Sequence, residues 1–127
     1  MKNYTPHSIT IIDPNTVQFD SSIRKYVATN PKIIKTIPSV GILNAKIETQ
    51  QIDKKDEVTI YHKTIKDIDP LPETNEIIIV SALYALAVQK INPDKANQCY
   101  TIADPVYNKD GTTVLGCLGI CKSILTT

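Results

Sequence analysis

The chain has 127 residues, 42% of them hydrophobic, which predicts a single domain over residues 1–127 with one core. Its 14 Lys and Arg residues nearly balance its 13 Asp and Glu residues, so the net charge gives no attraction to a nucleic acid polymer or to a membrane surface. The sequence has no signal peptide and no apolar run near the roughly 20 residues that span a bilayer. We therefore expect a cytoplasmic protein.

Arg24 is the single arginine, so an anion site in this protein must use lysines, hydroxyls and backbone N–H groups. The three cysteines lie in apolar surroundings, and their odd number argues against a disulfide framework. We expect them to be reduced and buried. The two histidines are far apart in the sequence, and no second cysteine pair accompanies the CxxxC spacing of Cys117 and Cys121. The sequence therefore predicts no metal site and no cofactor.

The first half of the chain predicts short strands separated by proline turns. Residues 8–12 form the first strand, and Asp13-Pro14-Asn15 turns the chain so that residues 16–19 return as its hairpin partner. A short helix is expected over residues 23–28, ahead of Pro31. Further strands are expected over 32–37, over 42–49 and from 58 to at least 65, with a turn at 38–41 and a polar loop at 50–57.

The clearest local signal is a strand followed by a helix. Residues 77–80 are an apolar β-branched run, and Ser81 then opens a helix over about residues 81–91 as its N-cap. Asn92-Pro93-Asp94 ends this helix. Its apolar residues at helical spacing, which predict the face toward the core, are Leu83, Leu86, Ala87 and Ile91.

The end of the chain predicts a β-hairpin, because Asp110-Gly111 lies between the β-prone segments 99–106 and 113–120. Together the elements indicate an α+β fold: a small, mostly antiparallel sheet of six to eight strands, one main helix and a C-terminal β-hairpin.

Candidate site residues are polar groups at turns, since the sequence contains no nucleophile elbow and no glycine-rich phosphate loop. A helix N-terminus or a turn can bind an anion, and a tyrosine ring can stack on a base. Each group also has a structural interpretation as a cap, a turn or a core tyrosine, and His7 as a turn imidazole bonded to a carbonyl. The residues proposed to bind ligand are Thr5, His7, Ser39, Ser81, Tyr84 and Asp94.

Five short elements, taken in order, resemble a family of small proteins common in phage genomes and prophages. They are Thr5-Pro6-His7, Pro38-Ser39-Val40-Gly41, Leu71-Pro72, the segment Ile79-Val80-Ser81-Ala82-Leu83, and Asp110-Gly111 followed by Leu115-Gly116-Cys117-Leu118-Gly119. The pattern covers most of the chain, and the resemblance implies a virus-associated origin more than an activity.

The chain also departs from the pattern of that family. Its members often carry an arginine near the helix end and a basic residue inside the terminal GCxG segment, where this chain has Asn92-Pro93-Asp94 and Leu118. If those charges bind a ligand in the relatives, either the ligand differs here or other basic residues replace them. The candidates for such a replacement are Lys90, Lys95 and Lys109.

By size and origin, the chain is similar to phage counter-defence sponges of the anti-Thoeris type, which sequester nucleotide immune signals. The leading hypothesis is a homo-oligomer in the host cell cytoplasm that binds a small anionic, nucleotide-like ligand without converting it. One alternative is a hydrolase or nuclease of such a signal, with His7 as base and Asp94 or Asp104 as its partner. Another is a protein-binding inhibitor or virion component that offers its C-terminal hairpin for strand addition.

Overall fold

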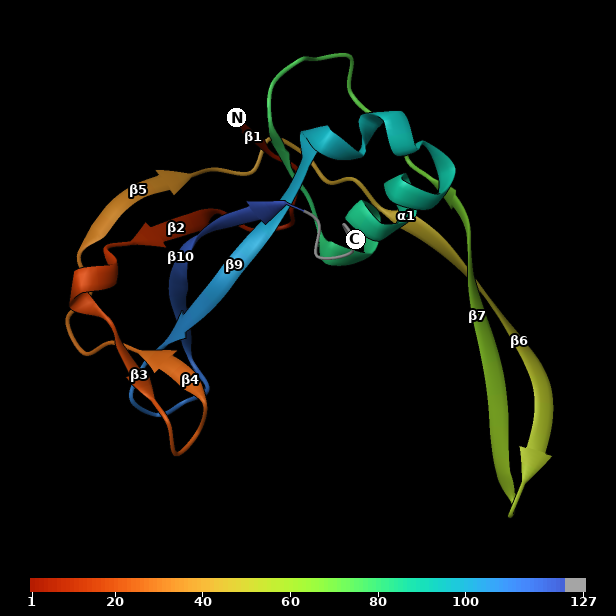
Figure 1. Cartoon of the computed structure of the whole chain (residues 1–127), viewed down its shortest axis with the longest axis horizontal. Helices are drawn as coiled ribbons and strands as arrows, with labels where there is room; N and C mark the ends of the chain where they lie inside the picture. The colour runs from red at the N-terminus through yellow and green to blue at the C-terminus, as the bar shows by residue number, and fades with distance from the viewer. Residues whose placement is uncertain (123–127) are drawn as a thin grey trace.

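The computed structural model describes residues 1–122 as an α+β fold, which confirms the predicted class (Figure 1). These residues form one α-helix, α1 (Ala82–Ile91), and two 3-10 helices, η1 (Pro14–Thr16) and η2 (Pro93–Gln98). The strands are β1 (Lys2–Asn3), β2 (Ile9–Ile12), β3 (Gln18–Asp20), β4 (Lys25–Val27), β5 (Ile33–Ile37), β6 (Ala45–Lys55), β7 (Val58–Ile68), β8 (Ile78–Ile79), β9 (Cys99–Tyr107) and β10 (Val114–Lys122).

Eight of these strands make one sheet, with the order β1-β8-β9-β10-β2-β5 and with β3 and β4 attached through a β4–β9 pair. The predicted C-terminal hairpin is confirmed, because β9 and β10 pair antiparallel on either side of the turn that contains Gly111. Strands β6 and β7 form a separate antiparallel ribbon that projects from the body (Figure 1). No helix within residues 1–122 is long and apolar enough to cross a membrane.

The strands at the two ends of the sheet order, β1 and β5, are joined by Asn3, whose side chain is fully buried. Its Nδ2 donates to the carbonyl oxygens of His7 (2.8 Å) and Ile37 (3.1 Å), and its Oδ1 accepts from the backbone N–H of Thr5 (2.9 Å). A parallel bridge between Asn3 and Ser39 lies beside these bonds. One amide side chain therefore joins β1, the turn that follows it and the end of β5.

Two local predictions for the first half of the chain are wrong. Residues 16–19 do not return as the partner of β2, which pairs instead with β5 and β10. The chain turns differently because the Asp13 side chain accepts from the Asn15 N–H and caps η1. The helix expected over residues 23–28 is absent from this part of the structure, where β4 pairs with β3 and β9 and the ring of Tyr26 packs against Phe19.

The prediction of a polar loop at residues 50–57 is also wrong, because β6 continues to Lys55. A two-residue turn at Asp56 and Glu57 joins the strands, with φ values of 50° and 66°. Positive φ at both central residues matches the twist of a two-residue hairpin, and Asp tolerates it better than most residues. The segment therefore forms a long ribbon instead of a loop.

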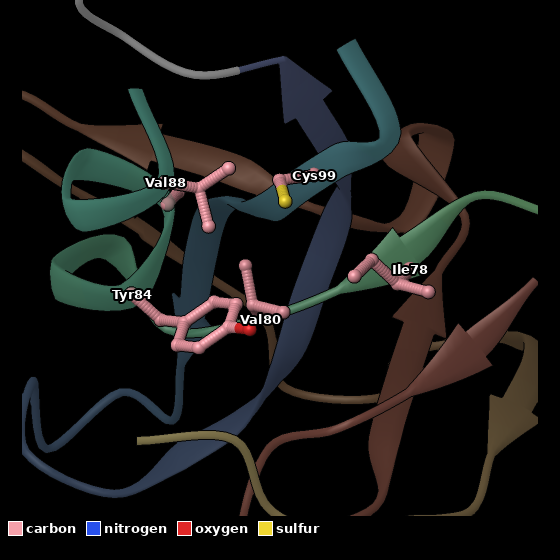
Figure 2. Close-up of a cluster of buried hydrophobic side chains, with 6 residues drawn as sticks. Ile78, Val80, Tyr84, Val88 and Cys99 are labelled. Atoms are coloured by element: carbon pink, nitrogen blue, oxygen red, sulfur yellow. The ribbon is translucent and has the colours of Figure 1, made fainter. Parts of the chain in front are cut away.

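Helix α1 begins after Ser81, as predicted, but of the four apolar residues predicted to face the core only Ala87 is fully buried. Tyr84 and Val88 pack with Cys99 and with Val80, the residue that follows β8 (Figure 2). Leu83 and Ile91, expected in the core, are 44% and 46% exposed. The helix is apolar on most sides, so periodicity alone does not select a face. The buried face also carries Ala85 and Ala87, whose small side chains allow the helix to approach the sheet closely.

Strand β8 is buried on both sides, and this explains its continuous apolar sequence. Ile78 faces the cluster under α1, whereas Ile79 packs with Ile9, Ile37 and Cys117 on the other side. The strand therefore connects two hydrophobic clusters and fixes the position of Ser81, which follows it.

Gly116 should be sensitive to the smallest enlargement. A Cβ there would lie 2.5 Å from the Thr10 carbonyl oxygen and 2.8 Å from Ile12 Cδ1, whereas a Cβ at Gly119 in the same strand would meet nothing within 4 Å. We expect Gly116→Ala to lower the free energy of unfolding by about 1–3 kcal/mol and Gly119→Ala to change it much less. Urea unfolding followed by circular dichroism measures both, and equal effects would contradict this account of β2–β10 packing.

Asn3→Asp should destabilise the fold strongly. The substitution removes both N–H donors of the side chain and buries a carboxylate. It leaves the Ile37 carbonyl without its partner and the His7 carbonyl with only the Thr5 hydroxyl. We expect a loss of about 3 kcal/mol or more in unfolding free energy at pH 7. The loss should shrink in acid, where the new carboxyl is neutral. Asn97→Asp at an exposed position is the control, and a similar loss there would remove the special role of Asn3.

Candidate functional site

Ser81 caps α1 and leaves part of the helix N-terminus open. Its Oγ accepts from the Tyr84 N–H at 3.2 Å, and its carbonyl accepts from the Ala85 N–H at 3.0 Å. The first N–H groups of an α-helix have no acceptor within the helix, which here applies to Ala82 and Leu83. Both residues are exposed. The confirmed N-cap therefore coexists with two N–H groups at the positive end of the helix dipole.

A hollow of about 550 Å³ lies in front of this helix end, and we call it the helix-end hollow. Its polar groups are the hydroxyls of Thr5, Ser81 and Thr101 and the thiol of Cys121, whereas most of the wall is aliphatic. The volume falls within the range of roughly 300–1,000 Å³ that is usual for small-molecule sites. The lining residues are Thr5, Val80, Ser81, Ala82, Leu83, Ala85, Leu86, Thr101, Ile102 and Cys121.

A second hollow, of about 650 Å³, lies between α1 and the base of the β6–β7 ribbon, and we call it the arm hollow. It shares Leu83 and Leu86 with the helix-end hollow, so the two adjoin along α1. Lys63 and Lys90 lie on its wall and supply the positive side chains that the helix-end hollow lacks. Lys90 is also one of the lysines that the sequence offers in place of an arginine at the helix end.

Thr5, Ser39 and His7 lie together, but only Thr5 reaches the helix-end hollow. The Thr5 hydroxyl donates to Asn3 Oδ1 at 2.6 Å, so its proton is engaged and its oxygen is left to accept from a ligand. Ser39 Oγ donates to the Thr5 carbonyl at 2.7 Å and supports the turn from behind. The His7 side chain is exposed and lines neither hollow.

Tyr84 and Asp94 lie apart from the helix-end hollow. Tyr84 is fully buried, and its hydroxyl donates to the Asp69 carbonyl at 2.8 Å, so its ring is not exposed for stacking on a ligand (Figure 2). Burial raises the pKa of this phenol to about 12, which keeps it neutral. Asp94 follows the C-terminal end of α1, a helix about 15 Å long. Of the six predicted residues, the hollow therefore joins Thr5 and Ser81.

The described residues do not assemble the catalytic pair that the enzyme alternative requires. His7 forms no ion pair with Asp94 or Asp104 within residues 1–122; the ion pairs there join Glu76 to Lys2 and to the N-terminal amine. Within the same residues, no three His, Cys, Asp or Glu side chains approach closely enough to hold a metal ion.

The sequence did not reveal Thr101 and Cys121 as wall residues. Their Cα positions pair across β9 and β10, and Thr101 Oγ1 lies 3.3 Å from Cys121 Sγ. Counting outward from Asp110-Gly111 would bring them close, but the register shifts between Val114 and Gly116 and breaks a simple count. The Asp110-Gly111 motif predicted the hairpin but not the register that places Thr101 opposite Cys121.

Comparisons with protein-family models, with curated proteins and with solved structures find no match for this chain. Because one fold class can carry many functions, the chemistry of the two hollows is what indicates the function of this chain.

The three cysteines should differ in reactivity. Burial raises the pKa of Cys99 to about 11 and holds the pKa of Cys117 above its usual value, whereas Cys121 is half-buried on the wall of the helix-end hollow. At pH 8 we expect a maleimide to label Cys121 at least about tenfold faster than the other two. Mass spectrometry of digests measures each site, and the unfolded chain should label at all three. Equal rates in the folded protein would contradict the described burial.

Proposed function

We propose that this protein binds a small, anionic, nucleotide-like ligand in the helix-end hollow and sequesters it unchanged. The observation that carries the proposal is a largely aliphatic hollow that is lined by three hydroxyls and by the first residues of α1, whose N–H groups have no acceptor within the helix. Such a combination suits a ligand that has both a ring system and an anionic group.

In this proposal the anionic group of the ligand lies at the N–H groups of Ala82 and Leu83. The helix dipole adds about half a positive charge there, which compensates for the scarcity of arginine. Lys63 and Lys90 on the adjoining wall extend the favourable potential toward a second anionic group. A ligand with two phosphates, such as an ADP-ribose isomer, would use both positions.

The ring of the ligand lies against the aliphatic wall formed by Leu83, Leu86 and Ile102. Thr5 Oγ1, whose proton is bonded to Asn3, accepts from a ligand hydroxyl or amino group. Thr5 acts as an acceptor here because its single hydroxyl proton is already bonded inside the protein. A ligand without a donor at that position should bind more weakly.

Sequestration requires no catalytic group, and we extend the proposal to its biological setting. A homo-oligomer in the cytoplasm of an infected host cell would lower the free concentration of a nucleotide immune signal. The support for this setting is the resemblance of the sequence to small phage proteins, together with the form of the hollow.

Ala82→Glu separates ligand binding from stability. A carboxylate in the first helical turn should raise the free energy of unfolding by about 0.3–1 kcal/mol through the helix dipole. The same charge should repel an anionic ligand and weaken its binding by at least about tenfold. Isothermal titration against a panel of cyclic nucleotides and ADP-ribose isomers measures the affinity, and protection of Cys121 from maleimide provides a second readout.

Ala82→Gln is the matched control, since it adds nearly the same volume without charge. Asp94→Asn, at the other end of α1, should leave affinity unchanged. If no compound of the panel binds the natural protein at high micromolar concentration, the proposal is overturned. Chromatography of the recovered ligand distinguishes the hydrolase or nuclease alternative: a sponge returns it intact after denaturation, whereas an enzyme gives new products.

A further inference from the structure

One side of β9 is only partly covered by neighbouring strands. Strand β8 pairs with it at Cys99 and Tyr100, and β4 pairs with it at Val106 and Tyr107 (Figure 1). Within the described part of the chain, no strand pairs on this side with residues 101–104, and we call this part of β9 the open edge. Strand β10 covers the opposite side of β9. The main sheet therefore has a gap between the end of β8 and the start of the β4 pairing.

The backbone N–H and C=O of Ile102 face this gap. The Tyr100 carbonyl accepts from the Val80 N–H at 2.9 Å, so the backbone groups of Tyr100 point toward β8. Successive residues of a strand direct their backbone groups to opposite sides, so Thr101 and Ala103 face β10 and Ile102 faces the same side as Tyr100. After Val80 the chain turns into α1, and among residues 1–122 no backbone group bonds to Ile102 across the open edge. One donor and one acceptor are therefore exposed together.

The open edge forms part of the wall of the helix-end hollow. Thr101 and Ile102 both line this hollow. Consecutive side chains of a strand point to opposite faces of the sheet, so a hollow lined by both residues reaches around the strand edge between them. Ile102 is also 44% exposed. A ligand in the hollow can therefore reach the backbone N–H and C=O of Ile102 as well as the hydroxyls of the wall.

The open edge is too short to accept another strand. Asp104 has a φ of 50°, which interrupts the extended backbone two residues after Ile102. Pro105 follows and has no N–H to donate. A strand that adds to a sheet edge forms a row of main-chain hydrogen bonds, whereas this edge offers a single residue with both groups. The edge therefore suits a small planar group that carries one acceptor next to one donor.

We propose that the backbone of Ile102 recognises the base of the ligand and that this base is adenine. The binding mode rests on the proposed function, and it adds the group that selects the base. Adenine has an acceptor ring nitrogen next to its amino donor, so the Ile102 N–H donates to the ring nitrogen and the Ile102 carbonyl accepts from the amino group. Leu83 and Leu86 of the same hollow contact the ring. Guanine carries a further amino donor, which the aliphatic wall would leave without an acceptor.

Amide exchange of the full chain without ligand tests whether the edge is open. The Ile102 amide hydrogen should exchange at least about 100-fold faster than that of Ala103, which pairs with Gly119 of β10. Two-dimensional NMR of ¹⁵N-labelled protein measures both rates. Saturation with cyclic AMP or ADP-ribose should slow the exchange of Ile102 at least about tenfold. An Ile102 amide that exchanges as slowly as Ala103 in the ligand-free protein would overturn the proposal.

Ile102→Pro removes the donor that contacts the base. Proline is tolerated where a strand N–H is unbonded, so this variant should lower the urea midpoint much less than Ala103→Pro, which loses a bond to β10. It should weaken the binding of cyclic AMP and ADP-ribose, measured by isothermal titration, by at least about tenfold. The matched control is Ile102→Val, which keeps the N–H and a β-branched side chain and should bind within about twofold of the natural protein.

Dimethylation of the adenine amino group tests the same contact with the natural protein. The dimethylated analogues of cyclic AMP and ADP-ribose cannot donate to the Ile102 carbonyl and should bind at least about tenfold more weakly. Equal binding of the analogues, or equal binding by Ile102→Pro, would overturn the role of Ile102 and leave the proposed function intact. If neither adenine compound binds, the role of Ile102 is also overturned, whereas the proposed function fails only if the whole panel of cyclic nucleotides and ADP-ribose isomers fails to bind.

Discussion

The closure of the main sheet by Asn3 is the interaction on which the rest of the structure depends. This one buried amide donates twice and accepts from both the N–H and the hydroxyl of Thr5, so its hydrogen-bonding capacity is filled inside the protein. It sits on β1, which pairs with β8, and β8 leads directly to Ser81. The same residue thus places Thr5 on one wall of the helix-end hollow and the start of α1 on another.

Local signals in the second half of the sequence predicted a strand, a helix cap and a hairpin correctly. The apolar run before Ser81 became β8, the serine became the N-cap of α1, and Asp110-Gly111 joined β9 to β10. Each of these signals depends on neighbouring residues, because a cap or a two-residue turn satisfies backbone groups a few positions away. The α+β class followed from them without knowledge of the sheet order.

Pairing between distant segments was beyond the sequence patterns. Strand β2 pairs with β5 and β10, and no short-range feature distinguishes these partners from residues 16–19. The burial of α1 shows the same limit, because a helix apolar on most sides offers several faces. The face that packs on the sheet carries Tyr84 and two small alanines, and Leu83 is exposed to solvent. The residues of the candidate site were therefore only partly predictable. The sequence named Thr5, Ser81 and Lys90, whereas the positions of Thr101, Cys121 and Lys63 depended on long-range register and packing.

Leu83 and Ile102 on the wall of the helix-end hollow are each 44% exposed, so a ligand that lies against them covers apolar surface. In the proposed complex the ligand also excludes water from the start of α1. Removing water strengthens the attraction between an anion and the helix N–H groups, since the local dielectric falls. In the proposed complex, the apolar part of the ligand would thereby strengthen the binding of its own anionic group at the N-terminus of α1, without any arginine.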